Sequence, residues 1–225
     1  LRSISHDLRT TLTSISGNAS VLINNSGSLD ENKKMQLYEV IYDDSLWLIN
    51  LVENLLSVTR IEDGKMNLHL ETELIEEVIN EALNHISHKK DEHRIEVKAN
   101  DEFILAKIDA GLIIQVIINI VDNAIKYTPK GSMMSIETFK HKDFVEIQIA
   151  DDGAGISDKD KEKLFEMFYT VKHEVIDGRR GLGLGLALCK AIIVAHGGNI
   201  AVKDNIPHGT IFSFTLPIKE VEIHE

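Results

Sequence analysis

The sequence predicts an α+β protein in which an N-terminal helical hairpin, forming a dimeric four-helix bundle, is followed by an α/β sandwich. Two patterns indicate this. Up to about residue 61, apolar side chains recur every seven positions, which is typical of bundle helices, as at Leu1, Leu8, Ile15 and Leu22. Beyond Gly64, short strand-like runs mix with amphipathic helical runs without strict alternation. We therefore expect two domains, residues 1–64 and residues 65–225.

The composition is that of an acidic chain with enough apolar residues for real cores. Of its 225 residues 43% are apolar and 27% charged, which excludes disordered and collagen-like proteins. The formal net charge of −12 repels a phosphate backbone, so nucleic acid is not an expected partner. The lone Cys189 fits a reducing compartment. No apolar run approaches the ~20 residues of a membrane span, so we expect no membrane contact within this segment.

The first two elements are expected to be helices joined by a loop. The segment 24–32 has loop composition, and Asp30 is placed to cap the helix that follows. A hairpin of two helices leaves much of both apolar stripes in water. A second copy would cover them by completing a four-helix bundle, so we expect a homodimer.

The second domain is expected to mix strands and helices around one sheet. Alternating runs predict strands at residues 66–71, 94–98, 103–108, 133–149 (a hairpin), 200–202 and 210–216. Helical spacing predicts helices at residues 73–89, 111–127, 158–169 and 186–196. The glycine-containing stretch between the last two helices is expected to be irregular.

The first candidate for chemistry is His6, within SHDLRTTL. With Leu1 at heptad position a, His6 falls at the outermost position, with Thr10 one turn further along the same face and Asp7 beside it. A neutral imidazole can attack through one nitrogen while a carboxylate accepts the proton from the other. An exposed helical histidine can equally be an ordinary solvated residue, and this pattern alone leaves both interpretations open.

A polar ribbon on the apolar helix at 111–127 is the second candidate. It recurs at spacings of three and four, at Gln115, Asn119, Asp122, Asn123 and Lys126. Amides are fixed donors and acceptors that suit a cavity for a polar ligand, and an asparagine oxygen can bind Mg²⁺. A solvent-facing ribbon is the alternative.

Two glycine-containing segments complete the candidates. DDGAGI, residues 151–156, follows a strand, where its glycines would admit a flat ligand and Asp151 could accept a hydrogen bond from an exocyclic amine. The same letters also suit an ordinary turn. GLGLGL, residues 181–186, precedes a helix and could offer its amides to a phosphate. Its place near the C-terminus excludes the dinucleotide-binding loop of a βαβ unit.

In this order the motifs resemble the core of bacterial two-component sensor histidine kinases, with its HisKA and HATPase_c domains. SHDLRTTL is similar to the phosphoacceptor box, NIVDNAIKYTP to the N-box, DDGAGI and GLGLGL to the two glycine boxes, and LFEMFY to the F-box. The segments ISHDLRT and RRGLGLGLALCKAII are further similar to the potassium-responsive sensors of this family. The resemblance covers nearly the whole chain and implies a Bergerat ATP-binding sandwich for the second domain.

The resemblance also implies a role for each matching residue. His6 would be the phosphoacceptor, Asp7 would accept its proton, and Thr10 would align water when the response regulator is dephosphorylated. Asn119 would bind Mg²⁺ and Asp151 the adenine amine. The other residues expected to contact ATP are Asn123, Lys126, Tyr127, Gly153, Gly155, Ile156, Arg180, Gly181, Gly183, Leu184, Gly185, Leu186 and Thr210.

The implied activity is autophosphorylation of His6 from Mg-ATP and transfer to an aspartate of a response regulator, in the cytoplasmic part of a membrane-anchored sensor. Two alternatives remain: a non-catalytic dimeric ATP-binding scaffold, and an ATPase or serine kinase of the same superfamily. One residue departs from the family, because Thr11 stands where proline is usual. A straighter helix is expected there, with a changed balance of kinase and phosphatase activities.

Overall fold

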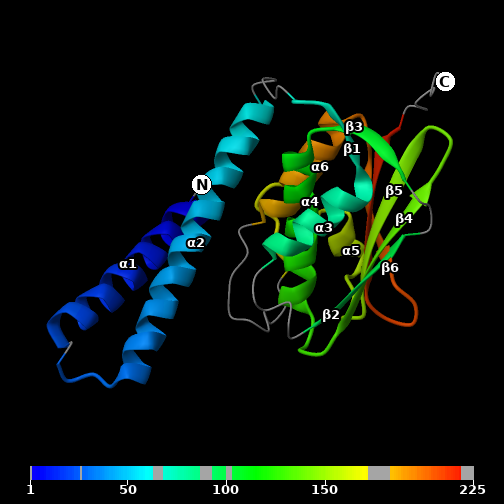
Figure 1. Ribbon diagram of the computed structural model, residues 1–225. Coiled ribbons are helices and arrows are strands. Elements are labelled where there is room, and N and C mark those ends of the chain that lie inside the picture. Colours follow the sequence, from blue (N-terminus) through cyan, green and yellow to red (C-terminus); the bar gives the residue numbers. More distant parts are fainter. Residues whose placement is uncertain are drawn as a thin grey trace. The chain divides into compact units, whose positions relative to one another are not determined.

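The computed structural model describes residues 2–25, 27–62, 68–86, 93–99, 103–171 and 183–218. The chain forms two compact units, Leu1–Thr59 and Arg60–Glu225 (Figure 1). The division lies close to the boundary expected from the change of pattern near Gly64.

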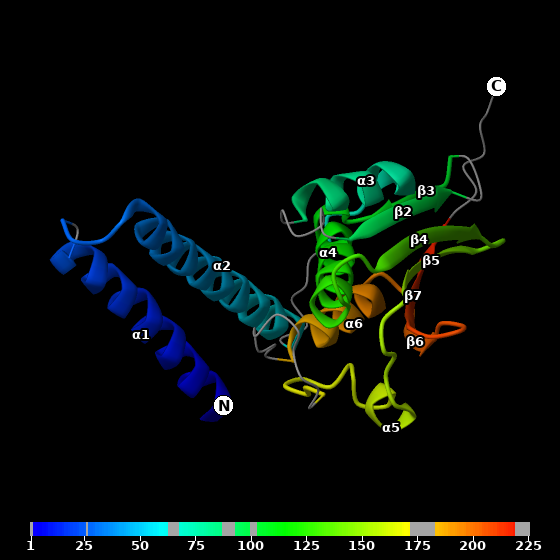
Figure 2. The same ribbon diagram turned by 90° about the horizontal axis from the view of Figure 1, so that it is seen from below.

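The first unit consists of two helices, α1 (Arg2–Asn25) and α2 (Glu31–Glu62), which run antiparallel in Figures 1 and 2. The turn between them is held by the Asn25 carbonyl oxygen, which accepts from the backbone N–H of Ser28 at 3.0 Å. Asp30 begins α2 as predicted, because its Oδ1 accepts from the N–H of Lys33 at 2.8 Å. The helix α1 continues through Thr11 without interruption.

The second unit is built on a five-stranded sheet in the order β2-β4-β5-β7-β6. Its strands are β2 (Arg94–Ala99), β4 (Met133–Lys140), β5 (Phe144–Asp151), β6 (Ile200–Asp204) and β7 (Thr210–Pro217). The β2–β4 pair is parallel and the other pairs are antiparallel. A separate antiparallel pair joins β1 (Glu71–Leu74) to β3 (Leu105–Ile108).

Three helices cover one face of this sheet, as Figures 1 and 2 show: α3 (Ile75–His85), α4 (Ala110–Tyr127) and α6 (Gly185–Ala195). Burial alternates along β4 and β5, so one side of each strand faces the helices. The shared core contains Ile117 and Ile120 of α4, Ile147 of β5 and Phe214 of β7. Among the described residues α4 alone is long and apolar enough to cross a membrane, but six of its side chains lie in this core.

The structure corrects two sequence predictions. The helix predicted at 158–169 is wrong beyond α5 (Asp158–Lys161), since turns follow and Phe168 adopts a positive φ of 66°. The reason is tertiary, because the Phe168 N–H donates to the Gly183 carbonyl oxygen at 2.8 Å and cannot continue a helix. The strand predicted at 66–71 is replaced by β1, which begins at Glu71, and positions 66 and 67 lie outside the described residues.

Candidate functional site

Asp109 fixes the start of α4, the helix that carries the polar ribbon. Its Oδ1 caps α4 by accepting from the Leu112 N–H at 3.3 Å, and its Oδ2 accepts from the N–H of His69 at 3.0 Å. Its own N–H donates to Nε2 of the buried His196 at 3.1 Å. The other ring nitrogen, Nδ1, therefore carries the proton and donates to the Ile192 carbonyl oxygen at 2.8 Å. This chain of contacts ties α4 to the end of α6.

The polar ribbon lies outside the core-facing side of α4. Asn119, Asn123 and Lys126 are half-buried, whereas the helix positions that alternate with them pack against the sheet. The Lys126 ammonium lies 5.1 Å from the ring centroid of Tyr127, and burial raises the pKa of that tyrosine. These three residues of the ribbon therefore place two amides and one cation beside the core-facing side of α4, whereas Asp122 is exposed.

Asn119 meets the start of α6. A Cβ at Gly185 would lie 3.2 Å from the Asn119 Oδ1, so the glycine admits the amide oxygen at close range. The contact brings together the N-box and the second glycine box, which are far apart in the sequence.

Asp151, at the end of β5, is buried, and its hydrogen-bond partners within the described residues all lie on one carboxylate oxygen. The residue is 7% exposed, and Oδ1 accepts from the N–H groups of Gly153 at 2.8 Å and Thr210 at 3.2 Å. Burial raises the pKa of Asp151, although the two backbone hydrogen bonds lower it. The second oxygen is thus left as an acceptor in a partly desolvated place.

Glycines shape the space beside this carboxylate. A Cβ at Gly153 would lie 2.8 Å from Cγ2 of Thr128, and one at Gly155, whose φ is +78°, would lie 3.3 Å from the Gly209 carbonyl oxygen. Gly183 has a φ of +66° and packs on the backbone of Tyr169, with no room for a side chain. These positions require glycine for close approach of backbone segments.

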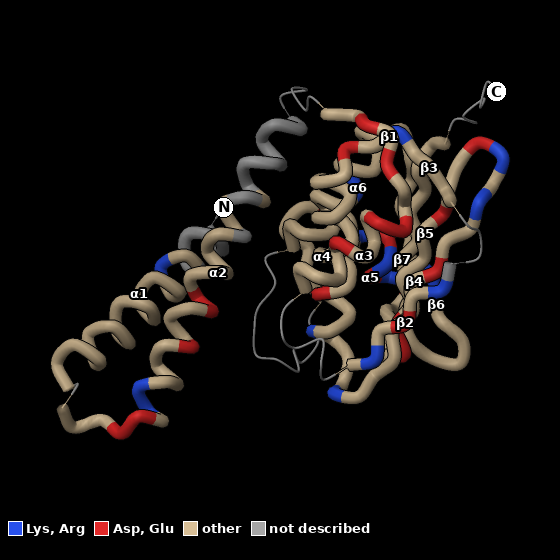
Figure 3. The backbone as a smooth tube through the Cα atoms, viewed as in Figure 1, with Lys and Arg blue, Asp and Glu red and all other residues tan. Residues whose placement is uncertain are grey.

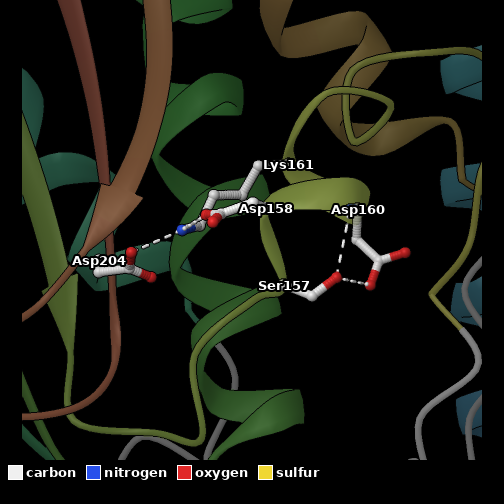
Figure 4. A network of polar contacts seen from close by, with 5 residues as sticks. All are labelled: Ser157, Asp158, Asp160, Lys161 and Asp204. Carbon is white, nitrogen blue, oxygen red and sulfur yellow. Dashed lines mark hydrogen bonds and ion pairs between the residues drawn. The ribbon is translucent and has the colours of Figure 1, made fainter.

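A polar network holds the segment that follows the first glycine box (Figure 4). Ser157 caps α5 by accepting from the Asp160 N–H at 3.3 Å, and its hydroxyl donates to Asp160 Oδ2 at 2.6 Å. Lys161 forms ion pairs with Asp158 at 2.8 Å and with Asp204 of β6 at 2.7 Å. The Tyr169 hydroxyl donates to Asp160 Oδ1 at 2.6 Å. The F-box is thereby tied to α5, and α5 to the edge of the sheet.

The structure brings some of the predicted residues together and leaves others apart. Asp151, Gly153 and Thr210 are in contact, and so are Asn119 and Gly185. Leu184 is buried, while Ile156 and Leu186 pack against the core, so these three support the site from within. Thr10 is exposed on α1. Arg180 and Gly181, and the side chains of His6 and Asp7, lie outside the described residues.

Sequence reasoning missed several contributors. Thr128 and Gly209 line the Asp151 turn, and His196 holds Asp109. Only Asp109 carried a local signal, because an aspartate directly before a helix is a preferred cap. The others act through contacts between distant segments.

Two family models match the chain side by side. The His Kinase A (phospho-acceptor) domain matches residues 1–64, and the histidine kinase-, DNA gyrase B-, and HSP90-like ATPase family matches residues 108–220. The chain belongs to the histidine kinases. The predicted family and fold class are therefore confirmed, with a helical N-terminal part before a sheet domain of the ATPase type.

Several curated relatives of this histidine kinase are named as sensor proteins or sensor kinases. It is 44% identical over 217 residues to the sensor protein KdpD of Clostridium acetobutylicum, covering 96% of this chain and 24% of that protein. KdpD of Escherichia coli is 32% identical with the same coverages, and the sensor histidine kinase WalK of Bacillus subtilis is 32% identical over 96% of this chain and 36% of its own length. The chain thus spans about a quarter of the KdpD proteins.

Solved structures show the same arrangement of elements. The histidine kinase AdeS of Acinetobacter baumannii superposes with a TM-score of 0.74 at 26% identity, covering 96% of this histidine kinase and 98% of that chain. The histidine kinase ThkA, solved in complex with the response regulator protein TrrA, gives a TM-score of 0.69 at 25% identity, covering 97% of this chain and 60% of that one.

Proposed function

We propose that this chain is a sensor kinase core that transfers the γ-phosphoryl group of Mg-ATP to His6 and then to an aspartate of a response regulator. The observation that carries the proposal is the geometry of Asp151. Two backbone amides occupy its Oδ1, so Oδ2 is left to accept a hydrogen bond from the adenine amine. Gly153 and Gly155 let the backbone segments around Asp151 pack closely, which holds the carboxylate in place.

The phosphates would lie between α4 and the start of α6. Lys126 supplies a cation near the end of α4, and Asn123 lies one turn before Tyr127 on the same helix. Backbone amides at the beginning of α6, from Gly183 to Leu186, would face the anion together with the positive end of the helix dipole. These local groups offset the overall negative charge of the chain.

The donor set also fits Mg²⁺. Within the described ranges no cluster of three or more His, Cys, Asp or Glu side chains could hold a metal, so the ion would be bound with the phosphates. Asn119 would supply the protein oxygen through Oδ1, which Gly185 admits beside the beginning of α6. When bound, the ion would neutralise charge on the β- and γ-phosphates.

His6 would act as the nucleophile. One imidazole nitrogen attacks the γ-phosphorus, so that a P–N bond forms while the bond from phosphorus to the β,γ-bridging oxygen breaks and ADP leaves. Asp7 accepts the proton from the other ring nitrogen. In the transfer to the regulator, the P–N bond breaks as the aspartate forms an acyl phosphate. The imidazole is then the leaving group and takes back a proton. Thr10, one turn from His6, would align water when that acyl phosphate is hydrolysed.

Exposed apolar side chains support the homodimer. Leu12 and Ile23 of α1, and Tyr38, Ile49 and Val52 of α2, are exposed in the isolated chain. Among the described residues, Figure 3 shows more charged residues of this unit along α2 than along α1. A second copy would cover these residues in a four-helix bundle. We also place this segment on the cytoplasmic side of a membrane-anchored sensor, where ATP and a response regulator are available.

Labelling with γ-labelled Mg-ATP tests the proposal. The chain should gain an acid-labile, base-stable label, and His6→Gln should lose it while nucleotide affinity stays within about twofold. The matched control His85→Gln changes an exposed helical histidine of the second unit and should keep the label. An acid-stable label, or ATP hydrolysis without any label, would favour the ATPase or serine kinase. Nucleotide binding without any transfer would favour the scaffold.

A further inference from the structure

We infer that Cys189 is a positioning residue for Asn119, because its buried thiol binds the amide nitrogen of Asn119 and so directs the amide oxygen toward the metal–nucleotide. The inference rests on the proposed function, in which that oxygen binds Mg²⁺. Cys189 lies on α6, and Asn119 on α4.

The Asn119 amide lies beside the first turn of α6, which runs from Gly185 to Cys189. Oδ1 lies beside Gly185, where a Cβ would be 3.2 Å away. Cys189 follows four residues later and is fully buried on the side that packs against α4. Its thiol donates to the Val116 carbonyl oxygen at 3.8 Å, and Val116 lies three residues before Asn119 on α4. The sulfur therefore sits on the face of α4 that carries Asn119.

The Asn119 nitrogen needs an acceptor. Nδ2 is buried, and within the described part of the chain it has no hydrogen-bond partner. A buried donor without a partner lowers the stability of the fold. We assign the Cys189 sulfur as its acceptor, because it faces the same side of α4. Sulfur is a weak acceptor, so such a contact would be longer and weaker than an ordinary hydrogen bond.

The thiol selects one orientation of the amide. Its S–H is directed to Val116, so the sulfur offers Asn119 only lone pairs, which attract the NH₂ end and leave the oxygen at Gly185. The opposite orientation would turn two N–H donors toward a cation.

Three substitutions in the full chain separate orientation from packing. Cys189→Ser keeps a donor and an acceptor, and Cys189→Val keeps an apolar side chain of similar size but removes both. Ile193→Val is the matched control, because it removes a methyl group from a fully buried position one turn further along α6. Thermal unfolding of each variant reports whether the domain remains folded.

Nucleotide affinity is then measured with ADP in excess Mg²⁺ and in EDTA. Cys189→Val should weaken ADP binding in Mg²⁺ by about threefold to tenfold, as expected for one hydrogen bond, and leave affinity in EDTA unchanged. Cys189→Ser and Ile193→Val should stay within about twofold of the parent in both. An unchanged affinity of Cys189→Val in Mg²⁺, or an equal loss in Mg²⁺ and EDTA, would overturn the inference.

A second readout needs neither metal nor nucleotide. The side-chain NH₂ signals of Asn119 in a ¹⁵N spectrum, assigned by their loss in Asn119→Asp, should shift and exchange faster with water in Cys189→Val but not in Ile193→Val. Signals that stay unchanged in Cys189→Val would refute the contact. If the parent chain binds ADP equally with and without Mg²⁺, the proposed metal site fails, while these signals still decide whether Cys189 holds Asn119.

Discussion

Asp151 is a buried residue with an ionisable carboxyl group, and burial disfavours the ionised form. Two backbone N–H groups stabilise the carboxylate, yet burial still raises its pKa above the ordinary value. An aspartate whose pKa is raised on folding disfavours the folded state when it is ionised. That cost is present at neutral pH and is relieved as the pH falls through the raised pKa.

Asp151→Asn should therefore weaken nucleotide binding without destabilising the domain. The variant removes the buried charge but turns an amide donor toward the adenine amine, so ADP affinity should fall about tenfold or more. The free energy of unfolding at pH 7 should be equal to or above that of the parent chain. Chemical denaturation and calorimetric titration measure the two quantities, and a clear loss of stability with retained affinity would contradict this role.

The same residue predicts a pH dependence of binding. As the pH falls through the raised pKa of Asp151, protonation of the free oxygen removes the acceptor for the adenine amine, and ADP affinity should decline. The decline should begin at a higher pH than it would for an aspartate of ordinary pKa. The decline should be absent from Asp151→Asn, which serves as its control in the same titration.

At the scale of elements, the continuity of α1 depends on having Thr11 rather than proline at position 11. The helix runs from Arg2 to Asn25 without a break, and Thr11 is half-buried within it. Proline at this position would remove the N–H that bonds to the preceding turn and would bend the helix just beyond His6.

Thr11→Pro should accordingly change the ratio of autophosphorylation to phosphatase activity toward the regulator. The ratio is measured by initial rates of label transfer from ATP and of label loss from the phosphorylated regulator. Thr11→Ala, which keeps the N–H, should leave the ratio near that of the parent. A ratio that does not move in Thr11→Pro would refute the link between helix bending and activity.

The contact between α4 and α6 depends on the residue before α4 and the residue after α6. Asp109 caps α4 and His196 follows α6, and the hydrogen bond between them crosses 87 positions of the sequence. The cap itself could be read from the sequence, because aspartate favours that position. The partner could not, since nothing local to His196 distinguishes a buried acceptor from a surface histidine.

For the whole molecule, the exposed apolar side chains of the first unit predict a dimer of about twice the chain mass in light scattering. Leu12→Glu places a charge on a residue that is 55% exposed in the isolated chain, and it should shift the chain toward the monomer because burial of the carboxylate is costly. Thr13→Glu, at the adjacent exposed position, is the control. Retention of the dimer by Leu12→Glu, or a monomeric parent chain, would contradict the bundle. ADP affinity should be unchanged in both variants.

The periodicity and the order of motifs in the sequence were sufficient to predict the helical hairpin, the mixed second domain and the family. Each of these features depends on spacing within short segments. The Asp30 cap and the glycine that follows Asp151 are of this kind. Tertiary structure decided the remainder. The Phe168 N–H donates to Gly183 instead of continuing a helix, and the N–H of Thr210 on β7 donates to Asp151 at the end of β5. The thiol of Cys189 on α6 donates to the Val116 carbonyl oxygen on α4. These contacts join segments distant along the chain, and their free energy depends on packing that no local window of sequence contains.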